Sequence, residues 1–300
     1  MAALVSSFTD SFRTLPFAQL RRNRYFYFYY DGFYAALCLG AIALMRATGH
    51  AGLFGEGAVF GPWSWAYLGA LPIVCYALIL CNAITHQCTH GSLPKPWNRI
   101  VGELAGMVVV TRFASWEVLH QRHHRYSDDV AKDPHPVNPS YLGFCWHHLA
   151  HIEKTLVQIA LDVHGDTPEN RRIEKLRSLV SFGTGVLLVS AWYHLLGFHA
   201  FLFLFLPAGV VGFFQLVHFN WATHDPWHPR GSFQPVNLDH GVYRLMNRLV
   251  LGIYMHANHH KRPRLLNPSK MEPSLPVLTR EEIAAQIAEK RALAAQAQSA

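Results

Sequence analysis

Residues 62–84 read PWSWAYLGALPIVCYALILCNAI, an uninterrupted run without a charged side chain. A stretch of about 20 apolar residues is long enough to cross the hydrocarbon core of a bilayer as one helix. Similar runs cover residues 25–45, 179–196 and 198–217. Because only Gly197 separates the last two, we expect them to form a hairpin of helices. The sequence therefore predicts an all-α integral membrane protein with four transmembrane helices.

The composition of the chain agrees with a membrane location. Of its 300 residues, 51% are hydrophobic and 15% are charged, whereas soluble domains carry about 25% charged residues. The formal net charge of +7 indicates a basic surface facing a membrane, and no nucleic-acid partner is expected. The five cysteines contain no CxxC pair, which favours small buried residues over a disulfide framework or a zinc ribbon.

The basic residues predict the orientation of the chain. Four arginines precede the first apolar run, only Arg46 of the 26 Lys and Arg residues falls between the first and second runs, and the hairpin tip carries none. Basic residues near transmembrane helices stay on the cytoplasmic side. We therefore expect both termini and the polar segments 85–178 and 218–300 to be cytoplasmic, in a bacterial inner membrane or an endoplasmic reticulum.

These boundaries divide the chain into three predicted parts. They are a cytoplasmic N-terminal segment at residues 1–24, a membrane domain at residues 25–270 and a C-terminal surface helix or tail at residues 271–300. Thr279 and Glu282 have the spacing of a capping box, which predicts where the C-terminal helix begins.

Three local features carry further expectations. Thr167, followed by Pro168, predicts the start of a helix that leads into the third apolar run. Residues 98–116 mix isolated charges with apolar side chains, which predicts one interfacial helix lying on the membrane. Asp31 interrupts the first run near its start, where we expect the headgroup region to solvate it.

Three clusters of histidines lie in the polar segments. They read HQCTH at 86–90, HQRHH at 120–124 and HANHH at 256–260. Helix positions i, i+3 and i+4 share one face, so each cluster aims its imidazoles at a common point. Eight imidazoles are too many for one ion and suit two. Structural zinc sites usually include thiolates, which are missing here, whereas imidazole also suits iron and copper.

These motifs resemble those of the membrane fatty-acid desaturase superfamily, whose relatives include carotenoid ketolases, alkane hydroxylases and lipid hydroxylases. HQCTHGS at 86–92, HQRHHRYSDDVAKDP at 120–134 and MHANHHKRP at 255–263 are similar to its three histidine boxes. HFNWATH at 218–224 resembles the Asn-xxx-His element of acyl desaturases. The resemblance covers about residues 25–270, including two apolar runs before the first box and two between the second and third.

The resemblance implies a non-haem di-iron site carried by a cytoplasmic helical cap. Two iron ions would activate O2, and the oxidant would remove hydrogen from an unactivated methylene group. Asn220 would act through an iron-bound water. The iron ligands implied are His86, His90, His120, His123, His124, His224, His256, His259 and His260.

One position departs from the family pattern. Many relatives carry Asp directly after the first histidine of the first box, where this chain has Gln87. An acid there would orient an imidazole through its far nitrogen. The acids that could do so instead are Glu117, Asp128, Asp129, Asp133 and Asp225, each of them individually expected to be a surface or turn residue. The HHxxH cluster at 147–151 matches no box and is not expected to bind metal.

Three functions remain open at this point. The favoured one is desaturation of a fatty acyl or related lipid chain, because the Asn220–His224 element resembles that of acyl desaturases. The alternative is a hydroxylase or ketolase acting on an alkane, carotenoid or lipid. A metal-binding membrane transporter is the remote alternative. Such a protein would place its histidines or acids within the spans, whereas the three histidine boxes lie outside the predicted spans.

The sequence contains no electron-carrier motif of its own. It lacks a His-Pro-Gly-Gly haem signature, a CxxC pair and a GxGxxG loop. We therefore expect a separate ferredoxin- or cytochrome-type electron donor that docks on the basic cytoplasmic face, because small electron carriers are often acidic. The residues expected to receive it are Arg122, Arg125, Lys261, Arg262 and Arg264.

Overall fold

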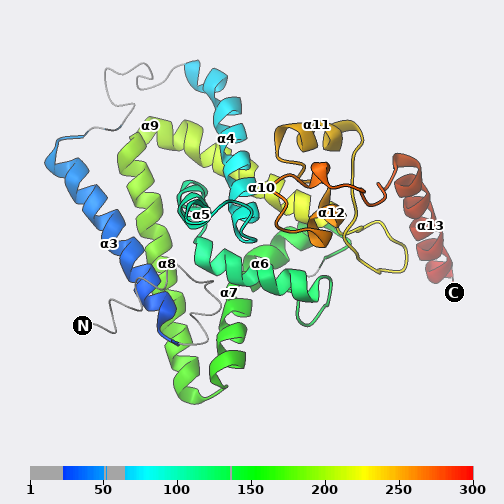
Figure 1. Cartoon of the computed structure of the whole chain (residues 1–300), viewed down its shortest axis with the longest axis horizontal. Coiled ribbons are helices and arrows are strands. Elements are labelled where there is room, and N and C mark those ends of the chain that lie inside the picture. The colour runs from blue at the N-terminus through cyan, green and yellow to red at the C-terminus, as the bar shows by residue number, and fades with distance from the viewer. Residues whose placement is uncertain (1–22, 51, 53–64, 136, 300) are drawn as a thin grey trace. The chain divides into compact units, whose positions relative to one another are not determined.

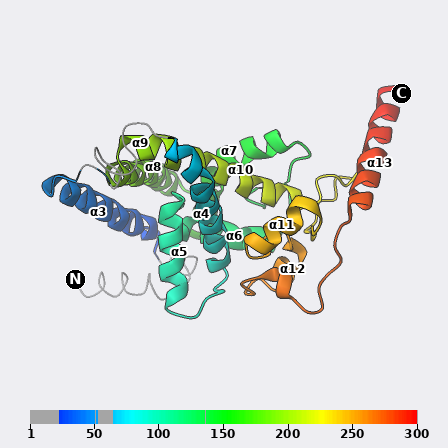
Figure 2. The same cartoon turned by 90° about the horizontal axis from the view of Figure 1, so that it is seen from above.

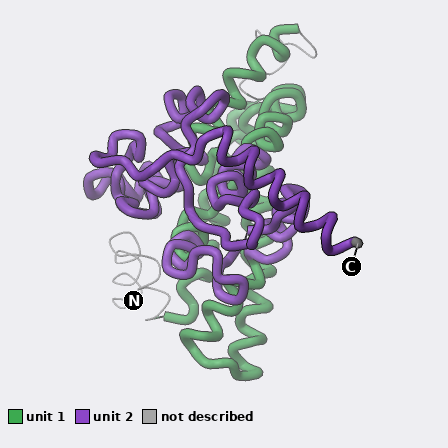
Figure 3. The backbone as a smooth tube through the Cα atoms, turned by 90° about the vertical axis from the view of Figure 1, so that its right-hand side faces the viewer, with its two compact units in different colours: residues 1–81, 103–118, 153–212 green, residues 82–102, 119–152, 213–300 purple. Residues whose placement is uncertain are grey.

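A computed structural model of the chain describes residues 23–50, 52, 65–135 and 137–299. Most of the N-terminal arginines used above to orient the chain lie outside these residues. The chain divides into two compact units (Figure 3). The first unit comprises residues 1–81, 103–118 and 153–212, and the second comprises residues 82–102, 119–152 and 213–300. Within the described residues the fold is helical, and only isolated bridges join Asn237 to Met255 and to Val277.

Four helical segments are long and apolar enough to cross a membrane. They are α3 (Phe26–Ala47), α4 (Ala66–Cys88), α8 (Pro168–Leu196) and the segment Phe198–Ala222 (Figure 1). The last contains α9 (Phe198–Ala200), the π-helical η1 (Phe201–Phe205) and α10 (Leu206–Ala222). The prediction of an all-α protein with four candidate membrane-spanning helices is therefore confirmed.

The third candidate span is longer than its apolar run. Thr167 accepts a hydrogen bond from the backbone N–H of Asn170, with Pro168 in the first turn, so α8 begins where the capping signal predicted. The helix then continues without a break into the apolar residues. It ends at Gly197, whose φ of 81° lies in the left-handed region that glycine adopts most easily. The predicted hairpin follows at this glycine.

Residues 98–116 do not form the single interfacial helix that was expected. They belong to α5 (Trp97–Val108) and α6 (Phe113–Tyr126), separated by a turn in which Val110 has a φ of 55°. The exposed apolar side chains of α5 include Trp97, Ile100 and Leu104. Of these two helices only α5 presents an exposed apolar face, while α6 carries the second histidine cluster.

The expectation that lipid headgroups solvate Asp31 is wrong. Its side chain is fully buried in the first unit and forms an ion pair with Arg112. Ser181 also donates to this carboxylate at 2.7 Å. Three segments far apart in the sequence therefore meet at one buried charge pair, and α3 packs along α8 beside it.

Removing the Asp31 carboxylate is expected to destabilise the protein strongly. The variant Asp31→Ala leaves the largely buried Arg112 guanidinium without an acidic partner, at a cost of about 3–5 kcal/mol. Unfolding of the detergent-purified protein by dodecyl sulfate measures the change. As a matched control, Asp166→Ala breaks the exposed pair with Arg171 and should cost less than about 1 kcal/mol. Equal losses in the two variants would contradict the burial argument.

The second unit has a small apolar core and contains the remaining helices. This core contains Val137, Phe144, Cys145 and Val217. The first part of α7 (Tyr141–His164) supplies two of these residues. The other elements are α11 (Gly241–Leu249), α12 (His256–Lys261), the 3-10 helix η2 (Pro268–Lys270) and α13 (Arg280–Ser299).

Backbone and capping hydrogen bonds organise the C-terminal elements of this unit, α11 to α13 (Figure 2). The backbone N–H of Leu238, before α11, donates to the carbonyl of Tyr254, before α12, at 2.9 Å. The capping box before α13 is confirmed, since Thr279 Oγ1 accepts from the backbone N–H of Glu282 and Glu282 accepts from that of Thr279.

Candidate metal centre

The three histidine clusters lie on helix ends and short helices of the second unit. His86 lies in the last turn of α4, and His90 follows directly after that helix. The second cluster lies on α6 and the third on α12. His224 follows the end of α10. The i, i+3, i+4 spacing on α6 and α12 turns each set of imidazoles toward one side. The expected common point is divided into two groups, because His120 and His124 lie in one and His123 in the other, and His259 is likewise separated from His256 and His260.

One group consists of five histidines. The ligand atoms of His86, His90, His120 and His259 lie within 4.8 Å of one another. The Nε2 atoms of His86 and His259 are 2.9 Å apart. His124 joins this group because its Nε2 lies 3.1 Å from those of both His120 and His259. All three boxes thus contribute to the five-histidine group.

The second group consists of four histidines. The ligand atoms of His123, His224, His256 and His260 also lie within 4.8 Å of one another. The Nε2 atom of His256 is 3.1 Å from those of both His224 and His260. The ring of His260 stacks on that of His124 with centroids 4.1 Å apart, so the two groups are neighbours. The structure therefore brings together all nine histidines that the sequence selected.

The spacing of these nitrogen atoms fits metal ligation. A metal–imidazole bond is about 2.1 Å long, so two ligands at a right angle around one ion place their nitrogens about 3.0 Å apart. The closest Nε2 pairs in both groups are separated by 2.9–3.1 Å. Nε2 of His259 faces two other Nε2 atoms at once, an arrangement that a shared cation stabilises better than N–H donors can.

Burial keeps these imidazoles in the form that binds metal. Desolvation lowers the pKa of His90 to about 3. It also lowers the pKa of other histidines in both groups, and the proximity of further imidazoles adds to the effect; these are His120, His124, His256, His259 and His260. Neutral imidazole offers a nitrogen lone pair, which protonated imidazole lacks.

Two aspartates of the second box orient histidines of the four-histidine group. Nδ1 of His123 lies 2.9 Å and 3.0 Å from the two carboxylate oxygens of Asp133. Nδ1 of His224 lies 3.0 Å from Asp128. Because a carboxylate only accepts hydrogen bonds, each Nδ1 carries the proton and each Nε2 keeps its lone pair.

Asp133 is itself held firmly in place. Its carboxylate accepts the backbone N–H groups of Asp128 at 2.7 Å and His135 at 3.0 Å. Burial acts to raise the pKa of this carboxyl group, but the electrostatic interaction and hydrogen bond of His123, together with those of His135, bring it below its ordinary value. Asp133 thus stays a carboxylate although its side chain is fully buried.

The other acids considered from the sequence differ in their surroundings. Asp129 accepts backbone N–H groups of Ala131 and Lys132, so it is the turn residue that was expected. Asp225 is buried and accepts from Gln286. Glu117 is a buried residue of α6. The expected surface position is therefore wrong for Glu117, Asp133 and Asp225, whose side chains are buried. Asp128 lies in a turn as expected, but it also contacts His224.

Gln87 and Asn220 are buried beside histidines of the two groups. Gln87 is 3% exposed and accepts a long hydrogen bond of 3.4 Å from Ser92. Asn220 is fully buried one turn before His224, and its Nδ2 donates to the carbonyl of Leu216. Within the described part of the chain, its Oδ1 has no hydrogen-bond partner. Asn220 therefore keeps an acceptor for a further ligand such as water.

His135 is a buried residue of the site that the sequence did not indicate. Its ring stacks on His123 with centroids 4.4 Å apart, and a ligand atom of each groups with Asp133. His148 packs next to it at 5.6 Å. In the HHxxH cluster, His147 and His151 instead bond to carbonyl groups of their own helix. The only sequence signal for His135 is its place two residues after Asp133.

Fold and histidine groups together define an integral membrane protein with a candidate metal centre. The fatty acid desaturase family model matches residues 61–269, so the chain belongs to that family and is an oxidoreductase. No solved structure matches the chain.

Two curated relatives carry desaturase names. An sn-1 oleoyl-lipid 12-desaturase of Picosynechococcus sp. is 42% identical over 52 residues, which are 17% of this chain and 15% of that protein. Another from Anabaena variabilis is 32% identical over 82 residues, which are 26% of this chain and 22% of that protein. The matched segments thus span less than a quarter of either relative.

Proposed function

We propose that this protein is a membrane-bound non-haem di-iron desaturase that uses O2 and two electrons to desaturate a fatty acyl or related lipid chain. The observation that carries the proposal is the meeting of five and four histidines in two neighbouring groups. In the reaction, a CH2–CH2 unit, O2, two electrons and two protons give a CH=CH unit and two molecules of water. Iron supplies the oxygen chemistry when it is bound.

The residues of the chain have separate tasks in this proposal. The five-histidine group would hold one iron and the four-histidine group the other. Asp128 and Asp133 keep a proton on the Nδ1 atoms of His224 and His123, which leaves each Nε2 available as a ligand. Asn220 would hold a water through its free Oδ1. We place this site, with both termini, on the cytoplasmic side of the membrane.

Mass spectrometry of whole lipid extracts tests the reaction. The full chain is expressed in a host without such enzymes, and its lipids are compared with those of the empty host. Desaturation predicts chains that have lost two hydrogens. Chains that have gained one oxygen would instead identify a hydroxylase, and a ketone would identify a ketolase. Metal uptake into vesicles without oxygen consumption would identify a transporter.

A separate acidic ferredoxin- or cytochrome-type protein is the proposed electron donor. Arg125 is exposed on α6, and three further basic residues are exposed at the end of α12 and just after it, namely Lys261, Arg262 and Arg264. Together they place positive charge on α6 and α12, which carry the second and third histidine clusters. Such a patch accelerates the encounter with an acidic partner, and salt screens the effect.

Neutralising this patch is expected to slow reduction of the protein without removing its metal. The variant Lys261→Gln, Arg262→Gln, Arg264→Gln should lower the rate of reduction by an acidic ferredoxin about tenfold at low salt. The difference should shrink as the salt concentration rises. Stopped-flow spectroscopy measures the rate, and elemental analysis confirms unchanged iron. An unchanged rate at low salt would contradict docking at this patch.

A further inference from the structure

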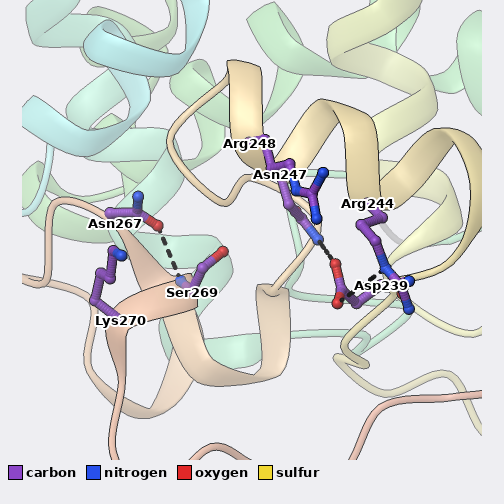
Figure 4. Close-up of a pocket in the computed structure, with 7 residues that line it drawn as sticks. All are labelled: Asp239, Arg244, Asn247, Arg248, Asn267, Ser269 and Lys270. Carbon is purple, nitrogen blue, oxygen red and sulfur yellow. Dashed lines mark hydrogen bonds and ion pairs between the residues drawn. The ribbon is translucent and has the colours of Figure 1, made fainter.

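A polar cavity lies beside α11, away from the histidines. Its volume is about 570 Å³, which is the size of a small-molecule site. Asn267, Ser269 and Lys270 line one side, and Asn247 and Arg248 of α11 line the other (Figure 4). All of these residues belong to the second unit.

The cavity has two cations that are not neutralised. Arg244 donates to the backbone carbonyl of Asp239 at 2.9 Å and lies 3.6 Å from its carboxylate, so this pair is self-contained. Arg248 and Lys270 are both exposed, and neither has an acidic partner within the described part of the chain. A guanidinium and an ammonium facing one space are suited to a phosphate group.

The wall opposite α11 depends on a glycine. Gly252 has a φ of 67°, and a Cβ atom there would lie 2.4 Å from both Asn267 Oδ1 and Ser269 Oγ. Asn267 accepts the backbone N–H of Ser269 at 3.0 Å and so fixes the turn that presents Ser269 and Lys270 to the cavity. The hydroxyl group of Ser269 adds a neutral donor beside the two cations.

The same helix presents an apolar face to its surroundings. Val242, Leu245 and Leu249 are 63%, 54% and 45% exposed. Asn247 is buried and bonds to the backbone of Leu238 and Tyr254. Successive helix residues are about 100° apart, so Arg248 lies about 60° around the axis from Leu245. The unpaired cation therefore borders the exposed apolar face, as in helices that lie in a membrane interface.

We propose that α11 lies in the membrane interface and that Arg248, Lys270 and Ser269 bind the phosphate of an anionic phospholipid. The acyl chains of that lipid would cover Val242, Leu245 and Leu249. In a protein with four candidate membrane spans, a bilayer supplies both the phosphate and the apolar cover. An acidic protein partner would match the cations but would need an apolar surface of its own to cover the three side chains. The proposal does not depend on the iron chemistry.

Lipid binding to the detergent-purified full chain tests this site. Native mass spectrometry follows a titration with dioctanoyl phosphatidylglycerol. We expect Arg248→Gln, Lys270→Gln to weaken binding roughly 30-fold, since each basic residue near an anionic lipid contributes about a factor of five. The matched control is Arg230→Gln, Arg291→Gln, which removes two exposed cations that do not line the cavity and should leave the affinity unchanged.

Further arms separate the possible ligands. Ser269→Asp places a negative charge in the cavity and should also weaken lipid binding, and iron content should stay at the wild-type value in every variant. Equal affinity of wild type and the Arg248, Lys270 variant would overturn the proposal. So would displacement of the lipid by an equal concentration of inorganic phosphate, which would identify a site for the free anion.

Discussion

The variant His124→Ala is expected to lose lipid desaturation almost completely. Nε2 of His124 lies 3.1 Å from those of His120 and His259, which come from two different boxes. Its removal takes one nitrogen from the five-histidine group. Removing a residue that only hydrogen-bonds to a metal ligand lowers metal affinity or activity about 10–100-fold. Removing a ligand itself should therefore lower activity by more than about 100-fold. Lipid mass spectrometry and iron analysis measure the two consequences.

A histidine outside the groups provides the matched control. His147 bonds to the carbonyl of Gly143 on its own helix at 3.0 Å. His147→Ala should therefore keep both iron and activity. The same comparison applies to the four-histidine group, where His260→Ala is expected to behave like His124→Ala. Full activity in either ligand variant would show that the assignment at that position is wrong.

The second large effect is expected at Asp133, which is not one of the nine proposed ligands. In Asp133→Asn the amide no longer provides two acceptor oxygens to Nδ1 of His123, so the imidazole loses its fixed tautomer. We expect iron affinity to fall about 10–100-fold. Competition with a chelator measures the affinity, and the iron spectrum reports the altered ligand.

Asp129→Asn is the control for that variant. Asp129 belongs to the same acidic stretch, but it accepts backbone N–H groups in an exposed turn, which asparagine can also do. Iron affinity should therefore not change. If Asp133→Asn lowered only the thermal stability and left the affinity and the iron spectrum intact, its carboxylate would be structural and would not orient His123.

Features that depend on local pattern could be predicted from the sequence. The four candidate spans follow from the length of their apolar runs, and the starts of α8 and α13 follow from Thr167 and Thr279. Helical spacing selected the eight histidines of the three clusters, whereas His224 was selected only by the resemblance to acyl desaturases.

Features that depend on distant partners could not be predicted. Asp31 lies in an apolar run, and no residue near it in the sequence indicates that its partner is Arg112, 81 positions away. Asp128 and Asp133 read as turn residues because their partners, His224 and His123, are recognised only after the chain folds. His135 follows a proline in an irregular segment, where no helical period marks the direction of its side chain.

Metal analysis of the purified protein decides whether the nine histidines bind iron. We expect two iron ions for each wild-type chain, and we expect their loss in His124→Ala and His260→Ala but not in His147→Ala. A fully metallated wild-type protein containing one zinc ion, or no transition metal, would contradict it.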